Sequence, residues 1–314
     1  MSALATALDD YLALRRGLGT ELRGPAGLLR RFVEFADREG ATVVTTELAL
    51  RWARAPLAAT PATHAARLGH VRHFARWLSA IEPRTEVPPV GSLPARYRRR
   101  PPYIYSDSEV ARLVAAAATL PSPTGLRGPT FATLFGLLAA TGLRVSEALA
   151  LDRDDVDIAR GLLTVRHGKF GKARFVPVHQ TTEHALRCYE RQRDGQAPRP
   201  PSGAFFLSER GTRITEWSAR YTFALVSRAV GLRAPTQGGR HGRGPRLHDL
   251  RHHLAAATLV RWYREGRDVE RELPKLSTYL GHTHVADTYW YIEAVPELLQ
   301  LATERVTRSE EDRP

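Results

Sequence analysis

The sequence predicts a mainly α-helical protein with one small β-hairpin or sheet, divided into two domains. Apolar residues recur at three- and four-residue spacing along most of the 314-residue chain, which is typical of amphipathic helices. The stretch 161–178 instead alternates and contains β-branched residues around a Gly-Lys-Phe-Gly turn, which predicts a hairpin. A proline-rich, arginine-rich stretch near residue 90 breaks the helical pattern, and a chain of this length suits two domains.

The first domain, 1–82, is expected to be entirely helical. The apolar spacing predicts helices over 4–12, 22–35, 46–53 and 64–81. In the last of these, an apolar stripe from Leu68 to Leu78 is flanked by Arg72 and Arg76. Residues 83–102 form a basic, proline-rich linker, in which Arg98, Arg99 and Arg100 are suited to follow a phosphate backbone.

The second domain, 103–314, begins with a helix-start signal. Ser106 is expected to cap a helix, with Glu109 closing a capping box. Helices are expected over 110–118, 131–140, 181–192, 215–230, 248–264, 274–280 and 285–293, with a Gly/Arg-rich loop at 231–246. The tail 294–314 is apolar at intervals, and either packs as a helix on its own subunit or docks on a neighbouring one.

Charge points to a polyanionic partner. The formal net charge is +13 and the isoelectric point is about 10.5, which favours nucleic acid. Of the 46 basic residues 43 are arginine, and two of the three lysines, Lys169 and Lys172, lie in the hairpin turn. Arginine holds its proton at working pH whereas lysine can transfer one, so a lysine kept here suggests proton chemistry.

Other features of the sequence indicate the compartment in which the protein works. The single cysteine, Cys188, excludes an internal disulfide framework and suits a reducing compartment. The N-terminus has acidic residues where a signal peptide carries an apolar stretch, and no apolar run is long enough to span a bilayer. We therefore expect a cytoplasmic protein that associates with the nucleoid and not with a membrane.

Four short stretches carry the chemistry: TGLRVSEALAL at 141–151, HGKFGKARFVPV at 167–178, LHDLRHH at 247–253 and LGHTHVADTYWYIE at 280–293. Taken singly, each is compatible with an ordinary structural role: Arg144 would pair with Glu147, Lys169 would be a turn lysine, and His248 would cap its helix. The tyrosines at 289 and 291 would then be core aromatics. His248 and Arg251 stand three apart on a helix and so share a face.

Together and in this order, the four stretches resemble the tyrosine recombinase (phage integrase) family. The matching residues are Arg144, Lys169, His248, Arg251 and His282, and the family places its tyrosine nine residues after the last histidine, at Tyr291. The resemblance implies an N-terminal, SAM-like core-binding domain that binds DNA and a C-terminal catalytic domain. It also implies a site-specific recombinase that cuts and rejoins DNA through a 3′-phosphotyrosyl intermediate.

The roles implied by the resemblance agree with the chemistry of a phosphodiester. Arg144 and Arg251 would hold the non-bridging oxygens, where charge builds up in the transition state. Lys169 would protonate the leaving 5′ oxygen, His248 would manage the proton of the tyrosine, and His282 would hydrogen-bond a non-bridging oxygen. The guanidiniums would do the electrostatic work, so we expect no metal and no cofactor.

Two departures from the family pattern matter. The turn commonly reads G-K-G-x-K, but here Phe170 and Gly171 follow the first lysine, so Lys172 rivals Lys169 as the acid. Helical residues two apart point about 200° from each other, so Tyr289 and Tyr291 cannot share a role. Tyr289 and Trp290 are expected to be core or positioning residues. The ending DTYWYIEAVPELL resembles recombinases of small transposable elements.

The expected partners are double-stranded DNA at a specific recombination site, a homotetramer formed on two duplexes, and related recombinases. The arginines expected to contact DNA are Arg72, Arg76, Arg98, Arg99, Arg100, Arg220 and Arg243.

Three alternatives remain open on sequence grounds. A type IB topoisomerase-like enzyme uses the same residues to nick and close DNA without strand exchange. A DNA-binding protein without catalysis would need no complete set of these residues. HDLRH at 248–252 has the histidine spacing of a zinc-protease helix, but has aspartate where that motif needs glutamate.

Overall fold

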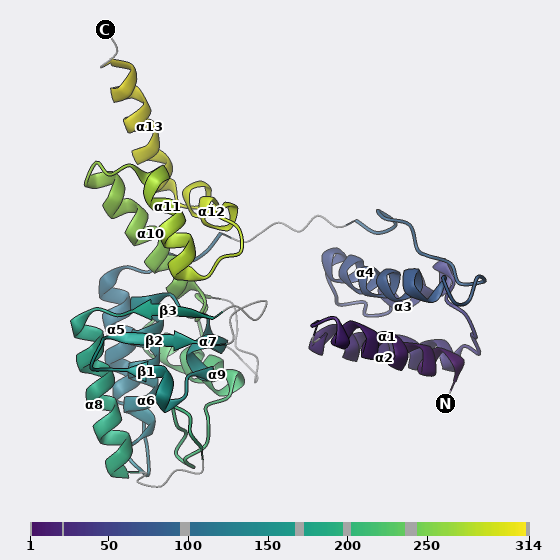
Figure 1. The fold of residues 1–314 in the computed structure, drawn as a ribbon, viewed down its shortest axis with the longest axis horizontal. Coiled ribbons are helices and arrows are strands. Elements are labelled where there is room, and N and C mark those ends of the chain that lie inside the picture. Colours follow the sequence, from purple (N-terminus) through teal and green to yellow (C-terminus); the bar gives the residue numbers. More distant parts are fainter. Residues whose placement is uncertain are drawn as a thin grey trace. The chain divides into compact units, whose positions relative to one another are not determined.

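The computed structural model describes residues 2–20, 22–94, 101–166, 173–196, 202–235 and 244–311. The chain divides into two compact units, residues 1–100 (unit 1) and 101–314 (unit 2). Helices dominate both, and one small antiparallel sheet lies in unit 2 (Figure 1). The predicted fold class is confirmed.

The described part of unit 1 has four helices, and short polar side chains cap the starts of three of them, α1, α3 and α4. Ser2, Thr45 and Thr60 each accept a hydrogen bond from a backbone N–H of the first turn that follows. The helices bury an aromatic core in which Phe32 meets Trp52 edge-on. Their bounds are α1 (Ala3–Gly17), α2 (Arg23–Arg38), α3 (Thr46–Arg54) and α4 (Pro61–Leu78).

The chain after α4 stays attached to unit 1 for more than ten residues. Glu86 accepts a hydrogen bond from the backbone N–H of Thr46 at 2.8 Å, and Leu93 is buried in the core of unit 1. Arg72 on α4 donates to the carbonyls of Pro88 and Pro89 at 2.7 and 2.8 Å. The described start of the segment predicted as a linker is therefore anchored.

In unit 2, some helices precede the sheet in the sequence and others follow it. Ser106 and Glu109 form the predicted capping box at the start of α5. The helices are α5 (Asp107–Ala118), α6 (Arg127–Thr141), α7 (Val145–Ala150), the 3-10 helix η1 (Arg153–Asp155), α8 (Gln180–Gln196), α9 (Glu216–Ala229), α10 (Asp249–Arg264), α11 (Val269–Leu280), α12 (Ala286–Ala294) and α13 (Pro296–Glu311).

The sheet has three antiparallel strands in the order β1 (Val156–Asp157), β2 (Leu162–Val165) and β3 (Arg174–Pro177). Strands β2 and β3 form the predicted hairpin, while β1 was not predicted because two residues leave no periodic signal. Leu163 pairs with Val176, and both are fully buried. Val165 pairs with Arg174, which places Arg174 at the end of β3 nearest the turn.

The described residues of unit 2 form two apolar clusters. One joins α5–α9 and the sheet, and the other joins α10–α13 around Leu259, Leu273 and Leu298. In Figure 1 the second group stands at one end of unit 2, beyond β3. Val295 and Leu298 anchor α13 in this cluster, so the tail begins as part of its own subunit.

Helix α11 begins five residues before its predicted start at residue 274. Asp268 caps the helix by accepting from the N–H of Arg271, and Pro274 lies inside it. The sequence prediction was wrong because proline lacks an N–H and usually marks a helix start. Within the described ranges, no helix has the length and apolarity needed to cross a membrane.

Candidate active site

Arg144 occupies the N-cap position of α7, two residues after the left-handed Gly142 that ends α6. Its Nη2 donates to the carbonyl of Gly281 at 2.9 Å, which joins residues 137 positions apart. Gly142 has φ +61°, and a Cβ there would come within 2.8 Å of the Leu280 side chain. A glycine is therefore required where α6 approaches the end of α11.

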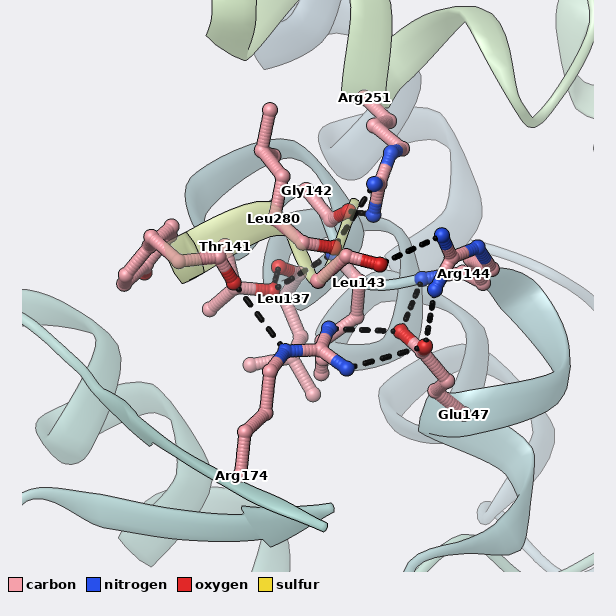
Figure 2. Close-up of polar contacts among 11 residues, drawn as sticks. Leu137, Thr141, Gly142, Leu143, Arg144, Glu147, Arg174, Arg251 and Leu280 are labelled. Carbon is pink, nitrogen blue, oxygen red and sulfur yellow. Dashed lines mark hydrogen bonds and ion pairs between the residues drawn. The ribbon is translucent and has the colours of Figure 1, made fainter. Parts of the chain in front are cut away.

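Arg251, on the first turn of α10, is almost completely buried. Its Nη1 donates to the carbonyl of Gly142 and its Nη2 to that of Leu280, each at 2.7 Å. These carbonyls lie at the C-termini of α6 and α11, where the helix dipole favours a cation. Both predicted arginines are thus held against the same pair of helix ends (Figure 2).

A buried carboxylate lies beneath Arg144. Glu147 Oε1 accepts from Nη1 of Arg144 at 2.6 Å, and its Oε2 accepts from the backbone N–H of Arg144 at 2.9 Å. Arg174 from β3 donates to the same carboxylate through both terminal nitrogens, at 3.1 and 2.9 Å (Figure 2). Burial raises the pKa of Glu147, but the bonds from Arg174 and Arg144 outweigh it and leave that pKa below its ordinary value.

His282 follows Gly281, whose φ of +70° ends α11. Its Nδ1 shares a 2.7 Å hydrogen bond with Thr288 on α12. Its ring stacks on that of Tyr291 with centroids 6.2 Å apart. Tyr291 is only 2% exposed, so it points from α12 into the protein, toward His282.

His248 precedes α10, and a second histidine continues the row. The ring of His252 lies 4.8 Å from that of His248 and 5.4 Å from that of Tyr291, measured between centroids. His252 is buried, 5% exposed. The two histidines and the tyrosine therefore form a continuous line of rings from α10 to α12.

Burial, aided by the cationic surroundings, lowers the pKa of both predicted histidines, so they are neutral at pH 7. Burial, followed by repulsion from Arg251, lowers the pKa of His248 to about 4. Burial, followed by repulsion from Arg251 and Arg144, also lowers the pKa of His282 to about 4. Burial, followed by repulsion from Arg144, lowers the pKa of Arg251 to about 10, so it remains charged. A neutral imidazole can accept a proton, and a site this cationic suits an anion.

The expectation for Tyr289 was wrong with respect to the core. Its side chain is 45% exposed, while Trp290 is partly buried against the α10–α13 cluster. The two tyrosines do point apart, as the helix period requires. Because Tyr291 turns inward, Tyr289 turns toward solvent.

The remaining predicted residues divide into two groups. Arg76 is exposed on α4, Arg72 holds the carbonyls of the following segment, and exposed Arg220 on α9 is paired with Glu216 at 3.0 Å. The other group lies outside the described residues: Lys169, Lys172, Arg98, Arg99, Arg100 and Arg243.

Sequence reasoning missed three residues that shape the site: Arg174, His252 and Thr288. His252 follows Arg251 directly, so it could have been noticed from its place in LHDLRHH. Arg174 is one of 43 arginines and carries no distinguishing local signal. Its role depends on a contact with Glu147, 27 positions away, that only the fold creates.

A family model described as "Phage integrase family" matches residues 105–297. "Putative integrase/recombinase y4rB" of Sinorhizobium fredii (strain NBRC 101917 / NGR234) is 46% identical over 317 residues, covering 100% of both chains. "Tyrosine recombinase XerC" of Mycobacterium tuberculosis (strain ATCC 25177 / H37Ra) is 32% identical, covering 97% of this chain and 98% of the relative.

Solved structures agree at the level of the fold. The Tn1549 transposon integrase in complex with transposon right end DNA has a TM-score of 0.65 at 15% identity, and the match covers 98% of this chain and 100% of the other. A lambda integrase dimer bound to a core site has a TM-score of 0.62 at 17% identity, and the match covers 92% and 94%.

Proposed function

Because this chain belongs to the phage integrase family, and is therefore a tyrosine recombinase that cuts and rejoins DNA, we propose that Tyr291 is its nucleophile. The observation that carries the proposal is the buried Tyr291 ring stacked on His282. The turn that holds this histidine also supplies carbonyls to Arg144 and Arg251. The phenolic oxygen would attack a phosphodiester and release the 5′ oxygen, leaving a 3′-phosphotyrosyl bond.

Arg144 and Arg251 are proposed to clamp the two non-bridging oxygens. A guanidinium has five N–H donors, and the contacts of Arg251 with the Gly142 and Leu280 carbonyls use two of them. The pentavalent transition state carries more charge on these oxygens than the ground state, so the clamp lowers the barrier. His282 would add a hydrogen bond to one of the same oxygens.

Proton transfer is assigned to His248 on the tyrosine side and to Lys169 on the leaving-group side. His248 is neutral at pH 7 and can accept the phenolic proton. A bound phosphate would offset the cationic repulsion that lowers its pKa, and would so make it a stronger base. Lys169 would donate to the 5′ oxygen, with Lys172 as the rival donor.

The proposed substrate is a specific site on double-stranded DNA, bound by a tetramer that joins two duplexes. The structures of relatives include a lambda integrase tetramer bound to a Holliday junction. The likeness to integrases favours an enzyme of a mobile element, acting at the nucleoid in the cytoplasm. The arginines that the sequence predicts to contact DNA, from Arg72 to Arg243, would supply phosphate contacts.

Tyr291→Phe tests the assignment, with Tyr289→Phe as its matched control. The DNA site is first selected from random duplexes by binding, and covalent protein–DNA adducts are then counted on a nicked duplex that carries it. Tyr291→Phe should bind this DNA and form no adduct, while Tyr289→Phe should form one. An adduct that maps to Tyr289 by mass spectrometry would overturn the proposal.

A further inference from the structure

Two arginines share one buried carboxylate in the site. The Glu147 side chain is 2% exposed, and its oxygens accept from Arg144 and from both terminal nitrogens of Arg174. Its lowered pKa keeps it ionised at pH 7. One negative charge between two positive ones leaves a net charge of +1 in this group.

Removing Arg174 would change that balance. Glu147 would then face Arg144 alone at 2.6 Å, and the carboxylate would neutralise the charge that Arg144 offers to a phosphate. A buried carboxylate without its second partner would also hold Arg144 more tightly. Arg174 therefore offsets the negative charge of Glu147, the residue that orients Arg144.

Arg174 also contacts the turn before His282. Its Nε donates to the carbonyl of Tyr279 at 3.2 Å. The Cβ of any other residue at Gly281 would lie 2.7 Å from the guanidinium carbon of Arg174. The side chain is only 13% exposed, so it fills the space between β3, α7 and the end of α11 (Figure 2).

We propose that Arg174 is a positioning residue for cleavage, which acts by compensating the Glu147 carboxylate so that Arg144 keeps its charge and direction toward the scissile phosphate. This inference rests on the proposed function. It requires no contact between Arg174 and the DNA. It predicts that the defect of an Arg174 variant depends on the charge of the phosphate and not on the leaving group.

Arg174→Gln should slow adduct formation on the order of tenfold or more, and less than Arg144→Ala, because it acts through another residue. Arg174→Lys keeps the charge but loses the bidentate contact with Glu147. Its rate of adduct formation should lie between those of Arg174→Gln and the wild type. Arg160→Gln, in the exposed turn between β1 and β2, removes the same charge without touching Glu147 and is the matched control. It should cleave at the wild-type rate.

Two further measurements separate charge compensation from simple structural support. Glu147→Gln combined with Arg174→Gln removes both charges, and should cleave faster than Arg174→Gln alone. A methylphosphonate at the scissile position has a neutral phosphorus centre, so the Arg174→Gln defect should shrink on it. A substrate with sulfur at the 5′ bridging position should leave the defect unchanged.

The outcomes distinguish this inference from the proposed function. If wild type forms no adduct at Tyr291, the proposed function fails. If wild type does and Arg174→Gln matches it, the inference fails alone. Rescue by the 5′-sulfur substrate would mean that Arg174 acts through the hairpin lysine, which also overturns it. A double variant slower than Arg174→Gln, with an unchanged methylphosphonate defect, would reduce Arg174 to a structural role.

Discussion

Lys169 and Lys172 stand out at the scale of single residues because almost every other cation in the chain is arginine. Arginine can neutralise a phosphate but cannot give up a proton at working pH. A leaving 5′ alkoxide needs a proton donor, and the two hairpin lysines are the proposed donors.

Lys169→Ala should therefore cleave more slowly, by roughly 10²–10⁴-fold if this is ordinary general-acid catalysis. Lys169→Arg should not restore the rate, since the charge is kept but the transferable proton is lost. A 5′-sulfur substrate, whose thiolate leaves without protonation, should remove most of the defect, measured as the rate of adduct formation.

Arg144→Ala is the control for that experiment, because its role at the non-bridging oxygens is independent of the leaving group. If sulfur rescues Lys172→Ala instead, the second lysine is the acid. Rescue of neither variant would contradict the argument from lysine scarcity.

The two site histidines make stability depend on pH in a defined window. Their folded pKa values of about 4 lie below the ordinary value of 6.5. Between pH 4 and 6.5 the unfolded chain binds protons that the folded chain does not, so stability falls as pH falls through this range. Replacing His248 and His282 by glutamine should flatten this part of the curve, measured by thermal unfolding at each pH.

His184→Gln serves as the comparison, because His184 is an exposed histidine on α8. It should leave the pH dependence between 4 and 6.5 as in the wild type. If the double glutamine variant loses stability just as steeply as the pH falls, other groups cause the pH dependence.

At the scale of elements, helix α13 buries one side and exposes another. Leu298 is completely buried against α10 and α12, whereas its neighbour Leu299 is 48% exposed. Leu298→Ala should destabilise unit 2 by roughly 2–5 kcal/mol, because the shorter side chain leaves a cavity in the cluster that also contains Tyr291.

Leu299→Ala, the same change one residue along, should alter stability by about 0.5 kcal/mol or less. Denaturant unfolding followed in unit 2 measures both. Equal effects of the two substitutions would mean that α13 is not anchored as described.

The success of the sequence prediction also varies by element. The hairpin follows from local alternation and the start of α5 from the Ser106–Glu109 capping box, so both could be predicted. The start of α11 could not, because Asp268 and Pro274 give competing local signals and packing decides between them. The choice of Tyr291 over Tyr289 rested on family spacing, and the contact between Arg174 and Glu147 is a tertiary one that no local pattern indicates.

Charge is the property that acts at the scale of the whole molecule. With a net charge of +13, DNA affinity should depend steeply on salt, because each neutralised phosphate releases counterions. A protein with 6–10 phosphate contacts loses about 10³–10⁵-fold in affinity between 50 and 200 mM salt, and we expect a loss of that order. Filter binding or anisotropy at several salt concentrations measures it.

The triple change Arg98, Arg99 and Arg100 to alanine should weaken binding across DNA sequences and make the salt dependence shallower. An effect confined to one DNA sequence would mean that these arginines read bases. A flat salt response of the wild type would contradict phosphate-directed binding.

The chain also carries a unique chemical handle. Cys188 is its only cysteine, and it lies exposed on α8. A maleimide dye or spin label will therefore attach at one defined place in the wild-type protein, with no background of other thiols to remove. In the proposed tetramer, four identical labels would report distances between subunits, so assembly on DNA can be followed spectroscopically without engineering the sequence.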